Sequence, residues 1–342
     1  MTPCLAALKS FHPDIEIDVL MEPLSAPILE DHPLVDNLLI TESSFAARAR
    51  LIPELRRRRY DVAYNLHGGT TAMMIARLSG AQHTVGFEGH RQSWMLTARA
   101  PAPDVIYDQS PIHSVEQQLA LLHWSGVPFF SSRPEEKPKL TLAVSSSAAA
   151  TMLERAAATG INTNGFGIIA PAAAMDSKQW RADGFAAVAD HLKEKWRLQS
   201  VVIAGPGQEQ IASQVSEISR TRPPVISGIT LKELIALTSF SRSFVGNDSG
   251  PAHIAAALNR PMVVVFGSSN SDVWHPWTEA PYSIVKAAQS ERAAGAAGFA
   301  ASPTPPISLV TNQNVITALD EVLQKAESKG EAGAQKEIRI ES

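Results

Sequence analysis

The chain has 342 residues, and at about 150 residues per domain this length predicts two domains. Hydrophobic residues make up 44% of the chain and charged residues 19%, which is typical of a folded globular protein rather than a disordered or fibrous one. A net charge of −4 and a pI near 6.2 argue against binding of nucleic acid through bulk charge. The single cysteine, Cys4, excludes a disulfide framework and a zinc site built from cysteines.

Signals for membrane insertion and secretion are not found in the sequence. No stretch of about 18 uncharged apolar residues occurs, so no transmembrane helix is expected. The first residues lack the basic segment, apolar run and small-residue cleavage site of a signal peptide. We therefore expect a cytoplasmic protein, and peripheral attachment to a membrane stays open because it leaves little trace in a sequence.

Short apolar runs alternate with longer helical stretches in the first part of the chain. Residues 15–19 alternate with period two and residues 62–66 form an apolar run, so both predict strands. Residues 71–78 and 115–124 have the spacing of helices. The basic run of residues 56–59 closes a helix, where the helix dipole favours positive charge and explains the run without a ligand.

Three prolines, Pro128, Pro134 and Pro138, separate this part from a second one and predict an interdomain linker. We expect an N-terminal domain over residues 1–135 and a C-terminal domain over residues 136–326. The second part repeats the alternation, with strands near 166–170, 201–204, 244–246 and 262–266 and helices near 183–196, 231–240 and 253–258.

Alternation of strands and helices over this length predicts parallel sheets. The expected fold is therefore α/β, with two Rossmann-like, doubly wound domains facing a cleft and ligands bound beyond the carboxyl ends of the strands. Residues 286–306 are rich in Ala, Gly, Ser and Pro and predict a loop, whereas residues 315–324 predict a helix. The charged, glycine-containing tail over residues 327–342 is expected to be disordered.

The most informative segment runs from residue 244 to residue 253, where a strand enters a polar loop and a helix begins at once. The free N–H groups at such a helix start bind phosphate. Gly250 would let the backbone come close to a ligand, and Ser249 would add a hydroxyl donor. The alternative is that Asp248 or Ser249 simply caps the helix.

Two further loops follow strands of the second part. Lys178 lies in the first, where a lysine can neutralise a diphosphate as a point charge or be an ordinary surface residue. Glu209 lies in the second, where it can accept hydrogen bonds from a ribose or favour a helix start. That loop has neither the GxGxxG nor the P-loop spacing, and the histidines show no metal-binding spacing, so we expect no metal site.

Together these segments resemble the ADP-heptose:lipopolysaccharide heptosyltransferases of glycosyltransferase family 9. The resemblance is carried by residues 246–258, 260–267, 177–180 with 184–186, 65–68, 76–81 and 85–87. It implies a GT-B fold whose second domain binds the nucleotide sugar and whose first domain binds the acceptor. The implied reaction is inverting transfer of heptose from ADP-heptose to the lipopolysaccharide inner core, either Kdo-lipid A or a heptosylated core.

The resemblance also implies roles for single residues. Lys178 would contact the donor phosphates, and the donor loop would consist of Asp248, Ser249, Gly250 and His253. Glu209 would face the ribose and Ile229 the adenine, and no cofactor or metal would be obligatory. His67 and Arg91 are candidates for binding the acceptor. The expected location is the cytoplasm, and peripheral association with the cytoplasmic face of the inner membrane stays open.

Two features depart from the family pattern. The family opens with an apolar strand and a Gly-Asp turn, whereas this sequence begins with a helix start at Met1, Thr2 and Pro3. The first strand and the catalytic aspartate are therefore expected to be absent, and a start codon assigned too late is the simplest explanation. Some heptosyltransferases of the second type have cysteines near residues 286–306, and this chain has none there.

Two other functions stay open at this point. The chain can be a catalytically impaired protein that keeps the nucleotide-sugar site, because inverting transfer needs a base for the acceptor hydroxyl. It can also be another GT-B sugar-nucleotide enzyme, such as an epimerase. The genomic DNA upstream of Met1 distinguishes an impaired protein from an active transferase. A comparison of ADP-heptose binding with UDP-sugar binding distinguishes a heptosyltransferase from another sugar-nucleotide enzyme.

Overall fold

The computed structural model describes residues 1–342 except residues 67, 129–137, 164, 288–304 and 341–342. The side chains of residues 330–340 are likewise not described. Two units divide the chain, Met1–Ala143 and Val144–Ser342, and they are called unit 1 and unit 2 below. Within the described residues, no helix is both long enough and apolar enough to cross a membrane.

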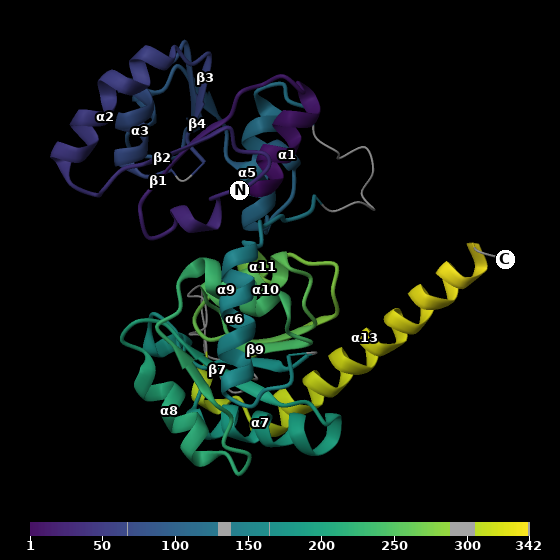
Figure 1. The fold of residues 1–342 in the computed structure, drawn as a ribbon. Helices are drawn as coiled ribbons and strands as arrows, with labels where there is room; N and C mark the ends of the chain where they lie inside the picture. The colour runs from purple at the N-terminus through teal and green to yellow at the C-terminus, as the bar shows by residue number, and fades with distance from the viewer. Residues whose placement is uncertain (67, 129–137, 164, 288–304, 341–342) are drawn as a thin grey trace, which may run out of the picture. The chain divides into compact units, whose positions relative to one another are not determined.

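Unit 2 is built on one sheet of six parallel strands (Figure 1). Its strands are β6 (Gly167–Ala170), β7 (Ser200–Ala204), β8 (Val225–Ser227), β9 (Ser243–Asn247), β10 (Met262–Val265) and β11 (Tyr282–Val285). The order across the sheet is β8-β7-β6-β9-β10-β11, so the chain reverses its direction of travel between β6 and β9. Such a switch point is where ligands bind in doubly wound sheets.

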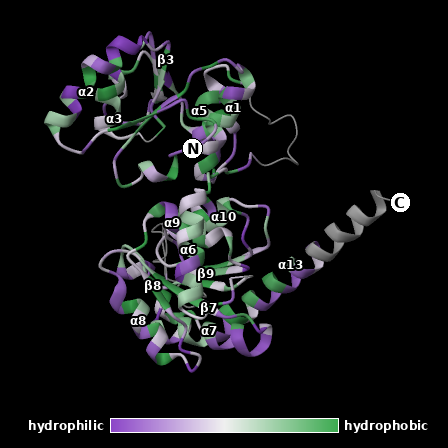
Figure 2. Ribbon diagram, in the orientation of Figure 1, coloured by the Kyte–Doolittle hydropathy of each residue, from purple (hydrophilic) through white to green (hydrophobic). Residues whose placement is uncertain are grey.

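The helices of unit 2 cover this sheet. They are α6 (Ser146–Ala158), α7 (Ala182–Trp196), α8 (Glu209–Ile218), α9 (Leu231–Ser239), α10 (Gly250–Ala257), α11 (Ser271–Trp274) and α13 (Asn312–Ile340). Strands β6, β7, β9 and β10 are buried at every position, as expected for parallel strands covered on both faces. The buried hydrophobic residues of unit 2 therefore lie on the strands and on the helix faces that pack against them (Figure 2).

Unit 1 contains two separate parallel sheets. Strands β1 (Asp18–Met21) and β2 (Asn37–Ile40) form one, and β3 (Val62–Tyr64), β4 (His83–Phe87) and β5 (Ala98–Ala100) form the other. The helices of this unit are α1 (Thr2–Phe11), α2 (Phe45–Arg58), α3 (Thr70–Leu78), α4 (Pro103–Tyr107) and α5 (Ser114–Trp124).

The strand order of unit 1 resembles that of unit 2, except at the position between its two sheets. In unit 2 helix α7 leads from β6 to β7, and β6 lies between β7 and β9. In unit 1 helix α1 leads into β1, but among the described residues no strand pairs with β1 on the side away from β2 or with β3 on the side away from β4. Among the described residues of unit 1, the strands therefore follow the order of unit 2 without a counterpart of β6.

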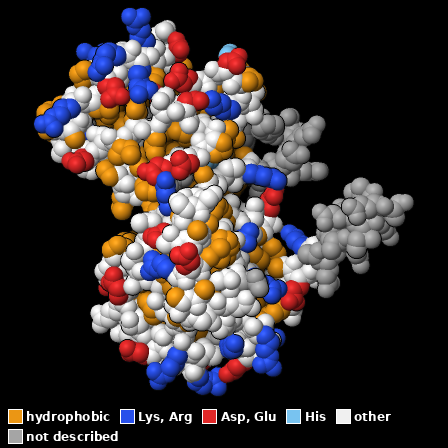
Figure 3. Space-filling model, in the orientation of Figure 1, with side chains coloured by type: hydrophobic (Ala, Val, Ile, Leu, Met, Phe, Trp, Pro, Cys, Tyr) orange, Lys and Arg blue, Asp and Glu red, His pale blue; other side chains and the backbone are white. Residues whose placement is uncertain are grey.

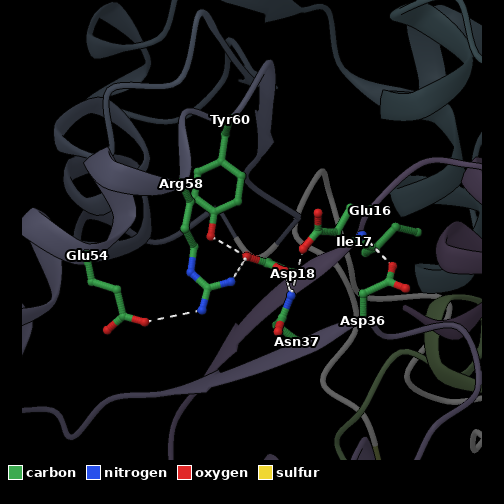
Figure 4. A network of polar contacts seen from close by, with 8 residues as sticks. All are labelled: Glu16, Ile17, Asp18, Asp36, Asn37, Glu54, Arg58 and Tyr60. Atoms are coloured by element: carbon green, nitrogen blue, oxygen red, sulfur yellow. Dashed lines mark hydrogen bonds and ion pairs between the residues drawn. The ribbon is translucent and has the colours of Figure 1, made fainter.

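A buried carboxylate of β1 connects the first sheet of unit 1 to the end of α2 and to the segment that leads into β3 (Figure 4). Asp18 Oδ2 accepts hydrogen bonds from Arg58 Nη1 at 2.8 Å and Tyr60 OH at 2.5 Å, and Asp18 Oδ1 accepts from Asn37 Nδ2 at 2.8 Å. Burial of the phenol and its hydrogen bond to the Asp18 carboxylate raise the pKa of Tyr60. Arg58 belongs to the basic last turn of α2, so this arginine has a structural partner.

Three segment boundaries were expected from the sequence, and the described residues bear on them to different extents. The division between units follows Ala143 rather than residue 135, and most of the proline-rich linker lies outside the described residues. Helix α13 extends to Ile340, into the tail over residues 327–342 whose expected disorder stays a prediction. The loop expected at 286–306 lies mostly outside the described residues.

Candidate functional site

Three adjacent strands of unit 2 end in loops at one edge of the sheet. In the sheet order β6-β9-β10, the loops begin at Pro171, Asp248 and Phe266. Because the strands are parallel, their carboxyl ends all meet at this edge. The candidate site is built from these three loops, which we call the lysine loop (171–181), the aspartate loop (248–249) and the serine loop (266–270).

An ion pair joins the first two loops. Lys178 Nζ lies 3.1 Å from Asp248 Oδ2. The Asp248 side chain is 6% exposed and the Lys178 side chain 24% exposed, so the ammonium reaches the surface while the carboxylate lies beneath it. A serine hydroxyl, that of Ser269 in the serine loop, donates to the same carboxylate oxygen. The structure thus brings together two residues that lie 70 positions apart in the sequence.

The amide of Asn247 fixes the lysine loop at both ends. Its Oδ1 accepts a hydrogen bond from the backbone N of Trp180 at 3.0 Å, and its Nδ2 donates to the carbonyl of Pro171 at 2.7 Å. Asn247 is fully buried at the last position of β9. The loop that carries Lys178 is therefore attached to the strand that directly precedes Asp248.

Trp180 anchors the end of the lysine loop in the core. Its indole is buried, donates from Nε1 to the Val310 carbonyl at 3.0 Å, and meets Phe185 edge to face at 5.0 Å between ring centroids. Gly184 makes room for the ring, since a Cβ there would lie 2.5 Å from an indole carbon. This packing explains why the Trp and Gly follow the lysine at these spacings.

The start of helix α10 is not capped by either side chain that was expected to cap it. Ser249 occupies the N-cap position, but its hydroxyl donates to the Asn247 carbonyl at 3.2 Å, and the Asp248 carboxylate is engaged by Lys178 and Ser269. A Cβ built at Gly250 meets nothing within 4 Å, so the backbone faces open space. An uncapped helix start with open space before it favours binding of an anion.

His253 lies on the first turn of α10 beside the ion pair. Its Nε2 is 3.9 Å from Asp248 Oδ1, and 45% of its side chain is exposed. Desolvation by the surrounding protein lowers the pKa of His253; the Asp248 carboxylate opposes this shift and the Lys178 ammonium adds to it. An imidazole at this place can donate or accept a hydrogen bond through its ring nitrogens.

The remaining expected site residues are not part of this cluster. Glu209 begins α8 after β7, is exposed, and accepts from the Gly207 backbone N at 3.3 Å, whereas the half-buried Ile229 follows β8. Both lie on the side of β6 away from β9. In unit 1, Arg91 is exposed in a turn after β4, and His67 lies outside the described residues.

Sequence reasoning gave no role to Asn247 or to the serine loop. An Asn at the end of an otherwise apolar strand is the signal that would have identified the first, because a buried amide needs partners. The serine loop shows no comparable pattern, since its role depends on contacts with the other two loops. Among the described residues, no group of three or more His, Cys, Asp or Glu side chains is arranged to hold a metal ion.

Comparison with known proteins identifies the family. The sequence model described as glycosyltransferase family 9 (heptosyltransferase) matches residues 48–295, well over half of the chain. Lipopolysaccharide heptosyltransferase 3 of Escherichia coli strain K12 is 30% identical over 295 residues, which cover 81% of each protein. Lipopolysaccharide heptosyltransferase 2 of Salmonella typhimurium strain LT2 is 27% identical over 282 residues, or 79% of each protein.

Solved structures share the fold. A family 9 glycosyltransferase from Veillonella parvula matches with a TM-score of 0.80 and 20% identity, covering 95% of this chain and 93% of that one. The ADP-heptose lipopolysaccharide heptosyltransferase II of E. coli matches with a TM-score of 0.76 and 22% identity, covering 95% and 94%. These likenesses confirm the expected GT-B fold with two Rossmann-like domains. The chain belongs to glycosyltransferase family 9, the heptosyltransferases.

Proposed function

We propose that this protein transfers heptose from ADP-heptose to the inner core of lipopolysaccharide, with inversion at the anomeric carbon. The observation that carries the proposal is the cluster of Lys178, Asp248 and the uncapped start of α10 at the switch point of unit 2. Family membership and the relatives' names supply the donor and acceptor. Charge and backbone donors in this cluster suit a sugar nucleotide's diphosphate.

The cluster would act on the leaving group. Inverting transfer breaks the bond between the anomeric carbon and the phosphate oxygen, so negative charge develops on ADP as the acceptor oxygen attacks. A lysine ammonium has three donors, and Lys178 uses one toward Asp248, which leaves two for phosphate oxygens. Together with the α10 N–H groups and His253, it would stabilise the departing diphosphate without an obligatory metal.

The rest of the donor would extend along the same edge of the sheet. Glu209 and Ile229 follow β7 and β8, which are the next strands beyond β6. We assign the ribose hydroxyls to the exposed Glu209 carboxylate and the adenine to Ile229. In unit 1 we assign the acceptor, Kdo-lipid A or a heptosylated core, to the region of Arg91 and His67, because an arginine pairs with phosphate or carboxylate groups.

We predict that Lys178→Ala weakens binding of ADP about ten- to a hundredfold, because one charge-assisted contact contributes about 1.5–3 kcal/mol. Isothermal titration with ADP and with ADP-heptose measures the effect. Lys193→Ala, which removes an exposed lysine of α7, is the control and is expected to bind as the wild type does.

Two results of this titration would contradict the assignment. An unchanged ADP affinity of Lys178→Ala would remove the lysine from the site, and loss of wild-type binding in EDTA would mean that a metal carries the diphosphate. Binding of UDP-sugars in place of ADP-heptose would favour another sugar-nucleotide enzyme of the same fold.

A second function, binding of the donor with only slow transfer, would apply to a protein that has no strand between β1 and β3, a position that none of the described residues occupies. The family resemblance assigns the catalytic aspartate to the turn after that strand, and loss of a general base slows transfer about 10²- to 10⁴-fold. We predict that an added apolar strand and Gly-Asp turn before Met1 raises heptose transfer by a factor in this range, while ADP affinity stays the same.

The matched control for this experiment carries the same strand with a Gly-Asn turn. It is expected to gain thermal stability, because a strand between β1 and β3 pairs their open edges, but not transfer activity. Equal transfer by the 342-residue chain and both extended chains would show that this carboxylate is not the base.

We also propose that the protein works in the cytoplasm, attached peripherally to the inner membrane through unit 1. This unit exposes large apolar side chains, among them Leu24 (84% exposed), Phe45 (82%) and Trp94 (72%), and Figure 3 shows hydrophobic side chains gathered on one of its faces.

We predict that Phe45→Ser with Trp94→Ser reduces cosedimentation with vesicles of phosphatidylethanolamine and phosphatidylglycerol, because fewer apolar groups can enter the bilayer surface. Trp274→Ser, at an exposed tryptophan of unit 2, is the control and leaves cosedimentation unchanged. Equal sedimentation of all three proteins would contradict attachment through unit 1.

A further inference from the structure

We infer that the serine loop positions the Lys178–Asp248 ion pair for the donor diphosphate. In this role Ser269 is a positioning residue for Asp248, and Gly267 leaves the space that the backbone of the lysine loop occupies. The inference rests on the proposed function, because it concerns how the same site holds ADP. Neither the sequence patterns nor the family resemblance gave a role to any residue of the serine loop.

Gly267 is required by the course of the lysine loop. A Cβ at this position would lie 2.0 Å from the Ser177 carbonyl oxygen and 3.1 Å from the Lys178 Cα. Both are backbone atoms, which cannot move aside as the end of a flexible side chain can. Any other residue at position 267 would therefore push the lysine loop, and Lys178 with it, away from the end of β10.

Two polar contacts hold the lysine loop in this close position. The Ser268 backbone N donates to the Ser177 carbonyl at 3.2 Å, and the hydroxyls of Ser177 and Ser268 are hydrogen-bonded at 3.0 Å. Asn247 attaches the same loop from β9. The residues that flank Lys178 are thus held from two neighbouring strands.

Ser269 acts on the other member of the ion pair. Its hydroxyl donates to Asp248 Oδ2, the oxygen that also accepts from Lys178 Nζ at 3.1 Å. Two donors converging on one oxygen fix the rotation of the carboxylate, and the carboxylate in turn fixes where the ammonium lies. Without the hydroxyl, Asp248 keeps its charge but not its orientation, so Lys178 is held less well for a phosphate.

The test is a double-mutant cycle on the full chain, with ADP affinity measured by calorimetry. Ser269→Ala is expected to weaken ADP binding about tenfold, and Ser269→Thr, which keeps a hydroxyl, recovers most of the affinity. In the Lys178→Ala background, Ser269→Ala is expected to change affinity less than about twofold, because its effect passes through the lysine. Ser213→Ala, at an exposed serine of α8, serves as the control.

The possible results separate this inference from the proposed function. Unchanged ADP affinity of Ser269→Ala, or an equal loss in both backgrounds, overturns the positioning role, since a general structural effect would be additive. Unchanged affinity of Lys178→Ala removes the lysine from the site and overturns this inference with it, whereas failure of the wild type to bind ADP or ADP-heptose overturns the proposed function. If Ser269→Ala does not fold, Gly267→Ala gives the second test: it is expected to lose ADP affinity at least as strongly, and wild-type affinity of this variant overturns the inference.

Discussion

The site in unit 2 depends on one buried amide, that of Asn247. Its two hydrogen bonds reach the start and the end of the lysine loop, at the carbonyl of Pro171 and the backbone N of Trp180. Asn247 and Trp180 are buried, so water does not replace the amide as a partner for these backbone groups. Leaving either group without a hydrogen bond would cost about 1–3 kcal/mol of folding free energy. By bonding both ends of the lysine loop, the amide also fixes where that loop places Lys178.

Three consecutive residues, beginning with the last residue of β9, have different structural roles. Asn247 satisfies backbone groups, Asp248 orients a cation, and Ser249 donates back to the strand, so none of their side chains is left to cap α10. The helix start therefore keeps its donors for a ligand. The same arrangement places an acidic group under a site for an anion, and this works because Asp248 lies below the surface while the ammonium reaches it.

The sequence predicted much of unit 2 and less of unit 1. Strands β6, β7, β9 and β10 were predictable because each contains a run of buried apolar residues, and the resemblance pointed to Lys178, Asp248 and His253. That Lys178 contacts Asp248 was not predictable, because 70 intervening residues set the register of three loops. Capping by Asp248 or Ser249 was the local alternative, and contacts that a sequence does not reveal exclude it: Lys178 and Ser269 engage the Asp248 carboxylate, and the Ser249 hydroxyl donates to the Asn247 carbonyl. Gly267 matters only through a carbonyl 90 residues earlier in the chain, at Ser177, which no local pattern reveals.

The most direct test of this account is the ADP affinity of Asn247→Ala, measured by calorimetry on folded protein and compared with Ser243→Ala. Both side chains are fully buried on β9, but Ser243 is at the opposite end of the strand from the three loops. The account predicts that Asn247→Ala binds ADP at least about tenfold more weakly than the wild type, whereas Ser243→Ala binds it normally. Wild-type ADP affinity in Asn247→Ala would contradict the claim that this amide builds the diphosphate site.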